Sequence, residues 1–160
     1  MRRLRAVTRP LAASDLPASA AIHVDAFPHA AISQLGAATA ERYHASLLAR
    51  DDVHALAAFS ADRLAGFCFG GTARDVEGAF LRNNLWFIGG ELLARPSLLA
   101  QPFIRDRIGA GLRFLRPKPA AKAEPIASAE SAAPSSFTIL YIAVHPDVEG
   151  RGVARQLLDA

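Results

Sequence analysis

The apolar residues in the first third of the chain recur at the spacing of α-helices. Those that share one side of a first helix are Leu16, Ala20, Val24 and Phe27. Ser14 or Asp15 can cap the N-terminus of this helix, and Pro28 ends it. A second helix is expected from about 31 to 49, so this part of the chain is predicted to be largely helical.

A different spacing, typical of strands, occurs before and after these helices. Residues 4–8 alternate between apolar and polar side chains. Residues 54–60 and 64–72 form two further strand-like runs, joined by the short polar link 61–63. The two runs are expected to pair as a hairpin, and its turn type stays open because the link contains no glycine.

Residues 80–116 return to a helical pattern, with a break near Arg95-Pro96. In the part from 103 to 116, an apolar stripe is flanked by arginines. Residues 117–136 are dominated by Pro, Ala, Ser and Lys, so little in them can pack. They predict a flexible low-complexity insert.

Residues 137–144 are continuously apolar and rich in β-branched and aromatic side chains. This composition predicts a buried strand in the centre of a sheet. Residues 145–147 stop the strand, and 149–154 open a helix with an apolar side. The chain ends at Ala160, within that expected helix.

Composition narrows the class of protein. Hydrophobic residues make up 51% of the 160 residues and charged residues 21%, which suits one packed domain and argues against global disorder. The net charge of +3 suits an anionic ligand, or a weak contact with nucleic acid or a membrane. Cys68 is the single cysteine, no Cys/His group has zinc spacing, and no apolar leader follows the basic start. The expected compartment is therefore the cytoplasm, and no metal site is predicted.

The strand, turn and helix near the C-terminal end together predict an anion site. Gly150 and Gly152 allow phosphate oxygens to approach the backbone without a Cβ in the way. The first N–H groups of the helix and its dipole favour negative charge. Arg151 and Arg155 add mobile positive charge, so a diphosphate is the expected ligand.

Two other phosphate-binding patterns are not met. A dinucleotide-binding fingerprint requires a third glycine where Arg155 stands, on a turn closer to the strand. Gly66 and Gly71 have the glycine spacing of a P-loop, but Thr72 stands where the lysine is required.

The segment from 139 to 158 resembles the signature strand–turn–helix of the GNAT superfamily of N-acetyltransferases. The family's turn pattern is [QR]-x-x-G-x-[GA], whose last two positions are filled here by Gly152 and Ala154. Glu149 stands where Gln or Arg is usual. Residues 15–27 resemble the family's first helix, 66–72 its early hairpin, and 80–116 an insert seen in some members.

This resemblance implies an α/β fold of the α+β type, with a mixed, mostly antiparallel central sheet flanked by helices. Residues 1–160 would be a single incomplete domain, the N-terminal part of an acetyltransferase, with the C-terminal strands missing. The insert at 117–136 has no counterpart in the family. Either the sequence is a truncated fragment, or a homodimer or a complementing chain supplies the missing half.

The resemblance also implies the function, which is transfer of an acetyl group from acetyl-coenzyme A to a primary amine of a small molecule or amino sugar. The residues expected to bind the coenzyme are Ile142, Ala143, Val144, Glu149, Gly150, Arg151, Gly152, Val153 and Ala154. Members of the family often place a glutamate, which acts as the base, early in the central strand. Thr138 stands at about that position here, and its hydroxyl cannot serve as a base. Their thiol-protonating tyrosine would lie beyond Ala160, so no catalytic residue is assigned.

The alternative is a non-catalytic GNAT-like domain that binds coenzyme A or a partner chain without turnover. Nucleic acid is not an expected partner, because aromatic residues make up only 8% of the chain and no binding motif is present. The basic amphipathic stretch 103–116 is expected to pack on the domain, with contact to a membrane surface as its alternative.

Five further residues with reactive side chains are expected to have structural roles. His23, His29 and His44 are expected to be surface or helix-packing residues, with contact to the acceptor as the less favoured alternative. Tyr141 is expected to pack within its strand, and Cys68 to be a buried, unreactive thiol.

Overall fold

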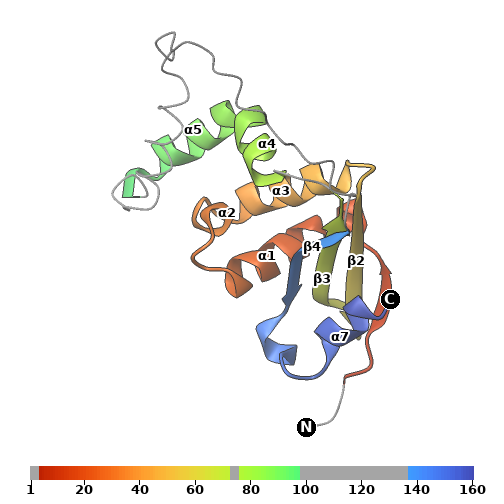
Figure 1. Cartoon of the computed structure of the whole chain (residues 1–160). Coiled ribbons are helices and arrows are strands. Elements are labelled where there is room, and N and C mark those ends of the chain that lie inside the picture. The colour runs from red at the N-terminus through yellow and green to blue at the C-terminus, as the bar shows by residue number, and fades with distance from the viewer. Residues whose placement is uncertain (1–3, 73–75, 98–136) are drawn as a thin grey trace, which may run out of the picture.

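The computed structural model describes residues 4–72, 76–97 and 137–160, and their centre is a four-stranded antiparallel sheet (Figure 1). The strands are β1 (Val7–Pro10), β2 (Val53–Ser60), β3 (Arg63–Gly71) and β4 (Thr138–Val144). They lie side by side in the order β1-β2-β3-β4, each antiparallel to its neighbour. The fold therefore belongs to the mixed α/β class of the α+β type that the sequence predicts.

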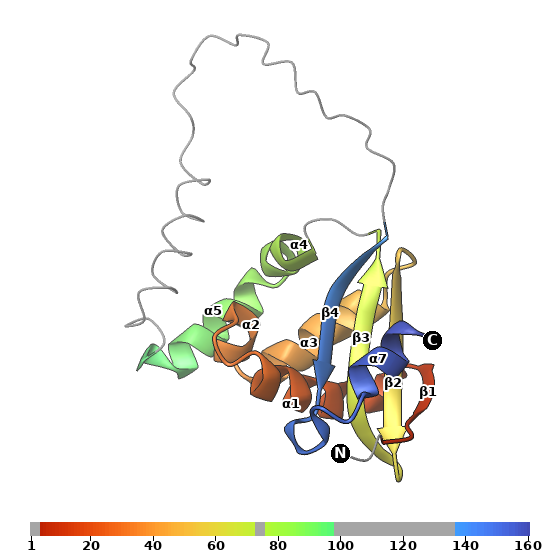
Figure 2. The same cartoon turned by 60° about the horizontal axis from the view of Figure 1, so that its bottom comes forward.

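Helices cover both faces of this sheet (Figure 2). One face carries α1 (Leu16–Ala26), α2 (Ala31–Gln34) and α3 (Ala37–Leu48). The short α7 (Val153–Leu158) packs on the other face against β2, β3 and β4. The pair α4 (Val76–Asn83) and α5 (Leu85–Ala94) extends from α3, away from the sheet (Figure 1). Among the described residues, no helix is long and apolar enough to cross a membrane.

The two faces of the sheet bury two separate apolar clusters. The larger one lies under α1 and α3 and includes Tyr43, Phe67 and Phe69, whose side chains are fully buried. The smaller cluster lies under α7 and consists of Ala58, Ala65, Cys68, Val153 and Leu157. A strand that contributes to both clusters must be apolar on both sides, which explains why the runs along β3 and β4 do not alternate.

The prediction that 137–144 is the central strand is wrong for the described residues. β2 and β3 have neighbours on both sides, and β3 is buried almost throughout, whereas β4 lies at the edge and is half-buried. Tyr141 contacts the larger cluster and Ile142 the smaller one. The apolar run of β4 therefore indicates that both faces of the strand are covered. It does not indicate whether the strand lies in the centre or at the edge of the sheet.

Several boundaries differ from those that the sequence predicts. The helix expected over 31–49 is divided at Gly36, where a φ of 98° breaks it into α2 and α3. The helical pattern expected from 80 begins at Val76, and its break at Arg95 is confirmed. The chain was expected to end inside a helix, but α7 ends at Leu158. The expectations for 103–116 and 117–136 lie outside the described residues.

The β2–β3 hairpin has a two-residue turn in which both residues are left-handed. Ala61 has a φ of 47° and Asp62 a φ of 61°. Positive φ at both central residues is the signature of a type I′ turn, whose twist matches that of the paired strands. The turn type left open by the sequence is therefore type I′, built without the glycine that usually relieves it.

Candidate functional site

The strand–turn–helix predicted from the sequence is present at the edge of the sheet. β4 ends at Val144, a 3-10 turn η3 follows at Pro146–Val148, and α7 begins at Val153. Two glycines between η3 and α7 are left-handed, with φ of 71° at Gly150 and 84° at Gly152. Residues other than glycine rarely adopt this conformation, so the two glycines determine the path of the turn.

The turn uses some of its own backbone N–H groups. Glu149 N donates to Pro146 O at 3.2 Å, and Arg151 N donates to Val148 O at 3.3 Å. Four other N–H groups have no backbone acceptor within the described part of the chain, and these belong to Gly150, Gly152, Val153 and Ala154. Only these four of the six N–H groups in residues 149–154 therefore remain to bind an anion.

The outer edge of β4, just before this turn, presents backbone groups that pair with no other described strand. His145 N donates to Ala65 O at 2.8 Å, and Ala143 O points at β3, 2.7 Å from where a Cβ on Gly66 would lie. Because antiparallel strands alternate hydrogen-bonded and non-hydrogen-bonded pairs, the N–H and C=O groups of Ile142 and Val144 face away from β3. Within the described residues, no strand pairs with this edge.

The predicted coenzyme-binding residues lie on β4 and on the turn and helix that follow it, and their side chains differ in exposure. Ala143 and Val153 are buried, and Ile142, Val144 and Ala154 are half-buried. The exposed members are Glu149, Gly150, Arg151 and Gly152. The apolar members therefore hold β4 and α7 to the domain, while the exposed members face solvent.

The N-terminal segment lies against this same turn and helix, and no pattern in the sequence indicates this contact. Gln156 on α7 accepts from Ala6 N at 3.0 Å and donates through Nε2 to Leu4 O at 2.8 Å. Leu4 N also donates to Arg151 O at 3.1 Å. The side-chain amide of Gln156 therefore pairs with the backbone of residues 4–6 as a neighbouring strand would, and it holds them next to the turn.

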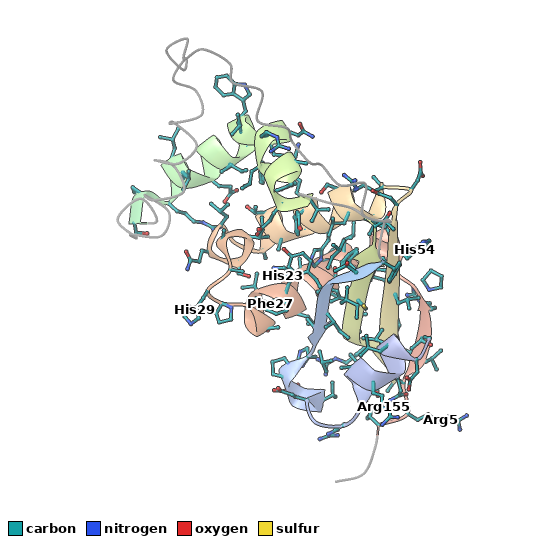
Figure 3. All side chains as sticks on the ribbon, viewed as in Figure 1. Arg5, His23, Phe27, His29, His54 and Arg155 are labelled. Carbon is teal, nitrogen blue, oxygen red and sulfur yellow. The ribbon has the colours of Figure 1, made fainter. Side chains whose placement is uncertain are left out.

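A second feature that the sequence did not reveal is a buried polar chain under α1. Ser19 Oγ donates to Leu16 O at 2.9 Å and lies 2.9 Å from His44 Nδ1. His44 Nε2 in turn lies 3.1 Å from His23 Nδ1. Both imidazoles are fully buried, so the prediction of helix-packing roles is confirmed for them, whereas His29 is exposed (Figure 3).

The bonds of this series link the protons of the ring nitrogens to one another. When the single hydroxyl proton of Ser19 is donated to Leu16 O, Ser19 Oγ accepts from His44 Nδ1–H. A neutral His44 then accepts at Nε2 from His23 Nδ1–H, which leaves a bare lone pair on His23 Nε2. That buried nitrogen has no hydrogen-bond partner among the described residues.

Burial keeps both rings neutral. It lowers the pKa of His23 to about 4, and burial together with the neighbouring His23 lowers the pKa of His44 to about 3. This series of hydrogen bonds ends at the carbonyl of Leu16, which cannot pass a proton onward. It holds the ring of His23 beside Tyr141 of β4, and the two ring centroids are 5.4 Å apart.

The remaining candidates have structural roles. Cys68 is buried, and burial raises the pKa of its thiol, which makes it a poor nucleophile. Tyr141 packs against the larger cluster, as expected. Within the described ranges, no group of His, Cys, Asp or Glu side chains could hold a metal ion.

Comparison with known proteins adds no relative. A search against protein-family models and a search of curated proteins each returned no match to this chain. The resemblance to GNAT acetyltransferases therefore depends on the chain's own sequence patterns, and mainly on the strand–turn–helix with its glycines.

Proposed function

We propose that this chain binds acetyl-coenzyme A along the outer edge of β4 and at the turn that follows it. The observation that carries the proposal is the continuity of the two features. Outward-facing backbone groups of Ile142 and Val144 lead directly into a turn with two left-handed glycines. Such an edge accepts an extended ligand as it would an added strand. The amides of a pantetheine arm can pair with the edge while its diphosphate reaches the turn.

The reaction that we propose is acetyl transfer to a primary amine of a small molecule or amino sugar. The amine nitrogen attacks the thioester carbonyl carbon, the C–S bond breaks, and the coenzyme leaves as a thiolate that takes up a proton. The outward N–H of Val144 would stabilise the negative charge that develops on the carbonyl oxygen. Holding both substrates on one edge supplies further acceleration through proximity.

The base that takes the ammonium proton is not assigned to a residue. His23 is a poor candidate, since its side chain is fully buried and its pKa is lowered to about 4. Thr138 stands on β4 where relatives place a glutamate, and a hydroxyl cannot serve as the base. The compartment that we propose is the cytoplasm, where the buried thiol of Cys68 would stay reduced.

Paired substitutions at Gly152 test coenzyme binding. Asparagine and aspartate both tolerate a left-handed backbone better than other residues, so Gly152→Asn and Gly152→Asp impose similar strain at a φ of 84°. They differ by one negative charge. Calorimetric titration with acetyl-coenzyme A should show at least a tenfold weaker affinity for Gly152→Asp than for Gly152→Asn. Equal affinities for the two variants would refute diphosphate binding at this turn.

The second candidate function is a domain that binds coenzyme A or a partner chain without turnover. It is favoured by the absence of an assignable base among the described residues. Coenzyme release measured with a panel of amines and amino sugars separates the two, because only the enzyme consumes acetyl-coenzyme A in the presence of an amine. Binding without release for every amine would support the non-catalytic domain.

A further inference from the structure

The N-terminal segment brings a cation to the proposed coenzyme site. Leu4 and Ala6 are both bonded to the amide of Gln156, so the backbone around Arg5 is held against α7. Arg155 is the residue before Gln156 on that helix. The side chains of Arg5 and Arg155 project on the same side of the molecule (Figure 3).

A cleft lies between these two side chains and the turn. Its volume is about 310 Å³, and it is lined by Leu4, Arg5, Gly152, Arg155, Gln156 and Asp159. That volume equals about ten water molecules at about 30 Å³ each, which is ample for one phosphate group. Since Gly152 belongs both to the cleft and to the turn, a ligand that occupies the turn also borders the cleft.

The charges around the cleft favour an anion. Two guanidinium groups face one carboxylate, that of Asp159, which lies 3.6 Å from Arg155 Nε. Arg5 forms no ion pair with any described residue. The cleft therefore has an excess of one positive charge, on a side chain whose planar fork suits phosphate oxygens.

We propose that Arg5 and Arg155 bind the 3′-phosphate of coenzyme A, the phosphomonoester on its ribose. This inference rests on the proposed function, because it requires the diphosphate of the same molecule at the adjoining turn. A phosphomonoester carries a charge of about −1.5 to −2 at neutral pH, more than one guanidinium neutralises. Arg5 is thus a specificity-determining residue that distinguishes coenzyme A from its 3′-dephospho form.

The test compares titrations of coenzyme A and 3′-dephospho-coenzyme A, with the ratio of their affinities as the readout. The wild-type chain should bind coenzyme A about fivefold more tightly, an effect typical of an exposed charge pair. Raising the salt concentration should reduce this ratio, because both arginines are exposed. Asp159→Asn should increase the ratio, since it removes the carboxylate that opposes the phosphate.

Arg5→Gln should bring the ratio close to one and leave the affinity for 3′-dephospho-coenzyme A unchanged. Arg50→Gln is the matched control, because it removes the same charge at the other end of β2. Arg50 comes before the start of β2, whereas Val7, which follows Arg5 by two residues, pairs with Phe59 near the end of that strand. Circular dichroism and thermal unfolding check that each variant folds.

The possible results separate the two proposals. A wild-type chain that binds both ligands equally would refute the role of Arg5 and leave the proposed function intact. Equal losses for both ligands in Arg5→Gln would likewise overturn the assignment to the 3′-phosphate. If neither ligand binds, the proposed function fails, and this inference fails with it.

Discussion

The buried pair of histidines should make the folded state sensitive to mild acid. In the unfolded chain an imidazole has a pKa of 6.5, whereas in the fold the values are about 4 for His23 and about 3 for His44. As the pH falls below 6.5, the two histidines bind protons in the unfolded state but stay neutral in the folded state. The free energy of unfolding therefore decreases with falling pH until the folded-state pKa values are reached.

The size of this effect follows from the two shifts. Between pH 7 and pH 5, each histidine should reduce the free energy of unfolding by about 2 kcal/mol, or about 4 kcal/mol for the pair. This is a large part of the 5–15 kcal/mol that is typical of a domain. Carboxylates held by arginines, such as Asp15 by Arg9, titrate below their usual pKa of 3.8 and act only at lower pH. The window from pH 7 to pH 5 therefore isolates the histidines.

Urea unfolding followed by far-ultraviolet circular dichroism at pH 7, 6 and 5 measures this dependence. The double variant His23→Gln/His44→Gln should be less stable at pH 7, but its stability should be nearly constant across the series. His29→Gln serves as the control, because it removes a histidine whose side chain is exposed. A wild-type change below about 1 kcal/mol, or an unaltered slope in the double variant, would show that the buried rings do not stay neutral.

Three further substitutions test the fold. Gly66→Ala should destabilise the domain by about 1–3 kcal/mol, because the new Cβ would lie 2.7 Å from Ala143 O, and an unchanged melting temperature would contradict the packing of β3 on β4. Ala61→Gly should stabilise it by about 1 kcal/mol by relieving a φ of 47°, which denaturant titration would detect, and a loss of stability would speak against the type I′ turn. Asp15→Ala should lower the free energy of unfolding by about 1–2 kcal/mol, since it removes two bonds from Arg9, at 2.7 and 2.9 Å, and a neutral result would show that solvent replaces them.

The parts of the fold that could be predicted from the sequence are those set by neighbours in the chain. Leu16 and Ala20 recur at helical spacing, and both are buried in the larger cluster. The hairpin of β2 and β3 follows from two apolar runs separated by a short polar link. The strand–turn–helix was predictable for the same reason, because all its residues lie within one short segment.

The parts that could not be predicted depend on residues far apart in the sequence. His23 and His44 lie on two helices, and no local pattern indicates that their rings meet. Gln156 meets Ala6 across 150 positions, and a glutamine on a short helix gives no sign of such a partner. Gly36 is a different case, because a lone glycine in a helical pattern is compatible with either a continuous helix or a break.

The bond between Gln156 and Ala6 also has a consequence for the making of the protein. A ribosome adds about 5–20 residues per second, so residues 4–6 would wait roughly 8–30 seconds before Gln156 is joined to the chain. Until then β1 can pair with β2, but the segment in front of it has no partner for its amides. The cleft that contains Arg5 is thus assembled only after Gln156 has been added, when the strands and helices between these two partners have already been made.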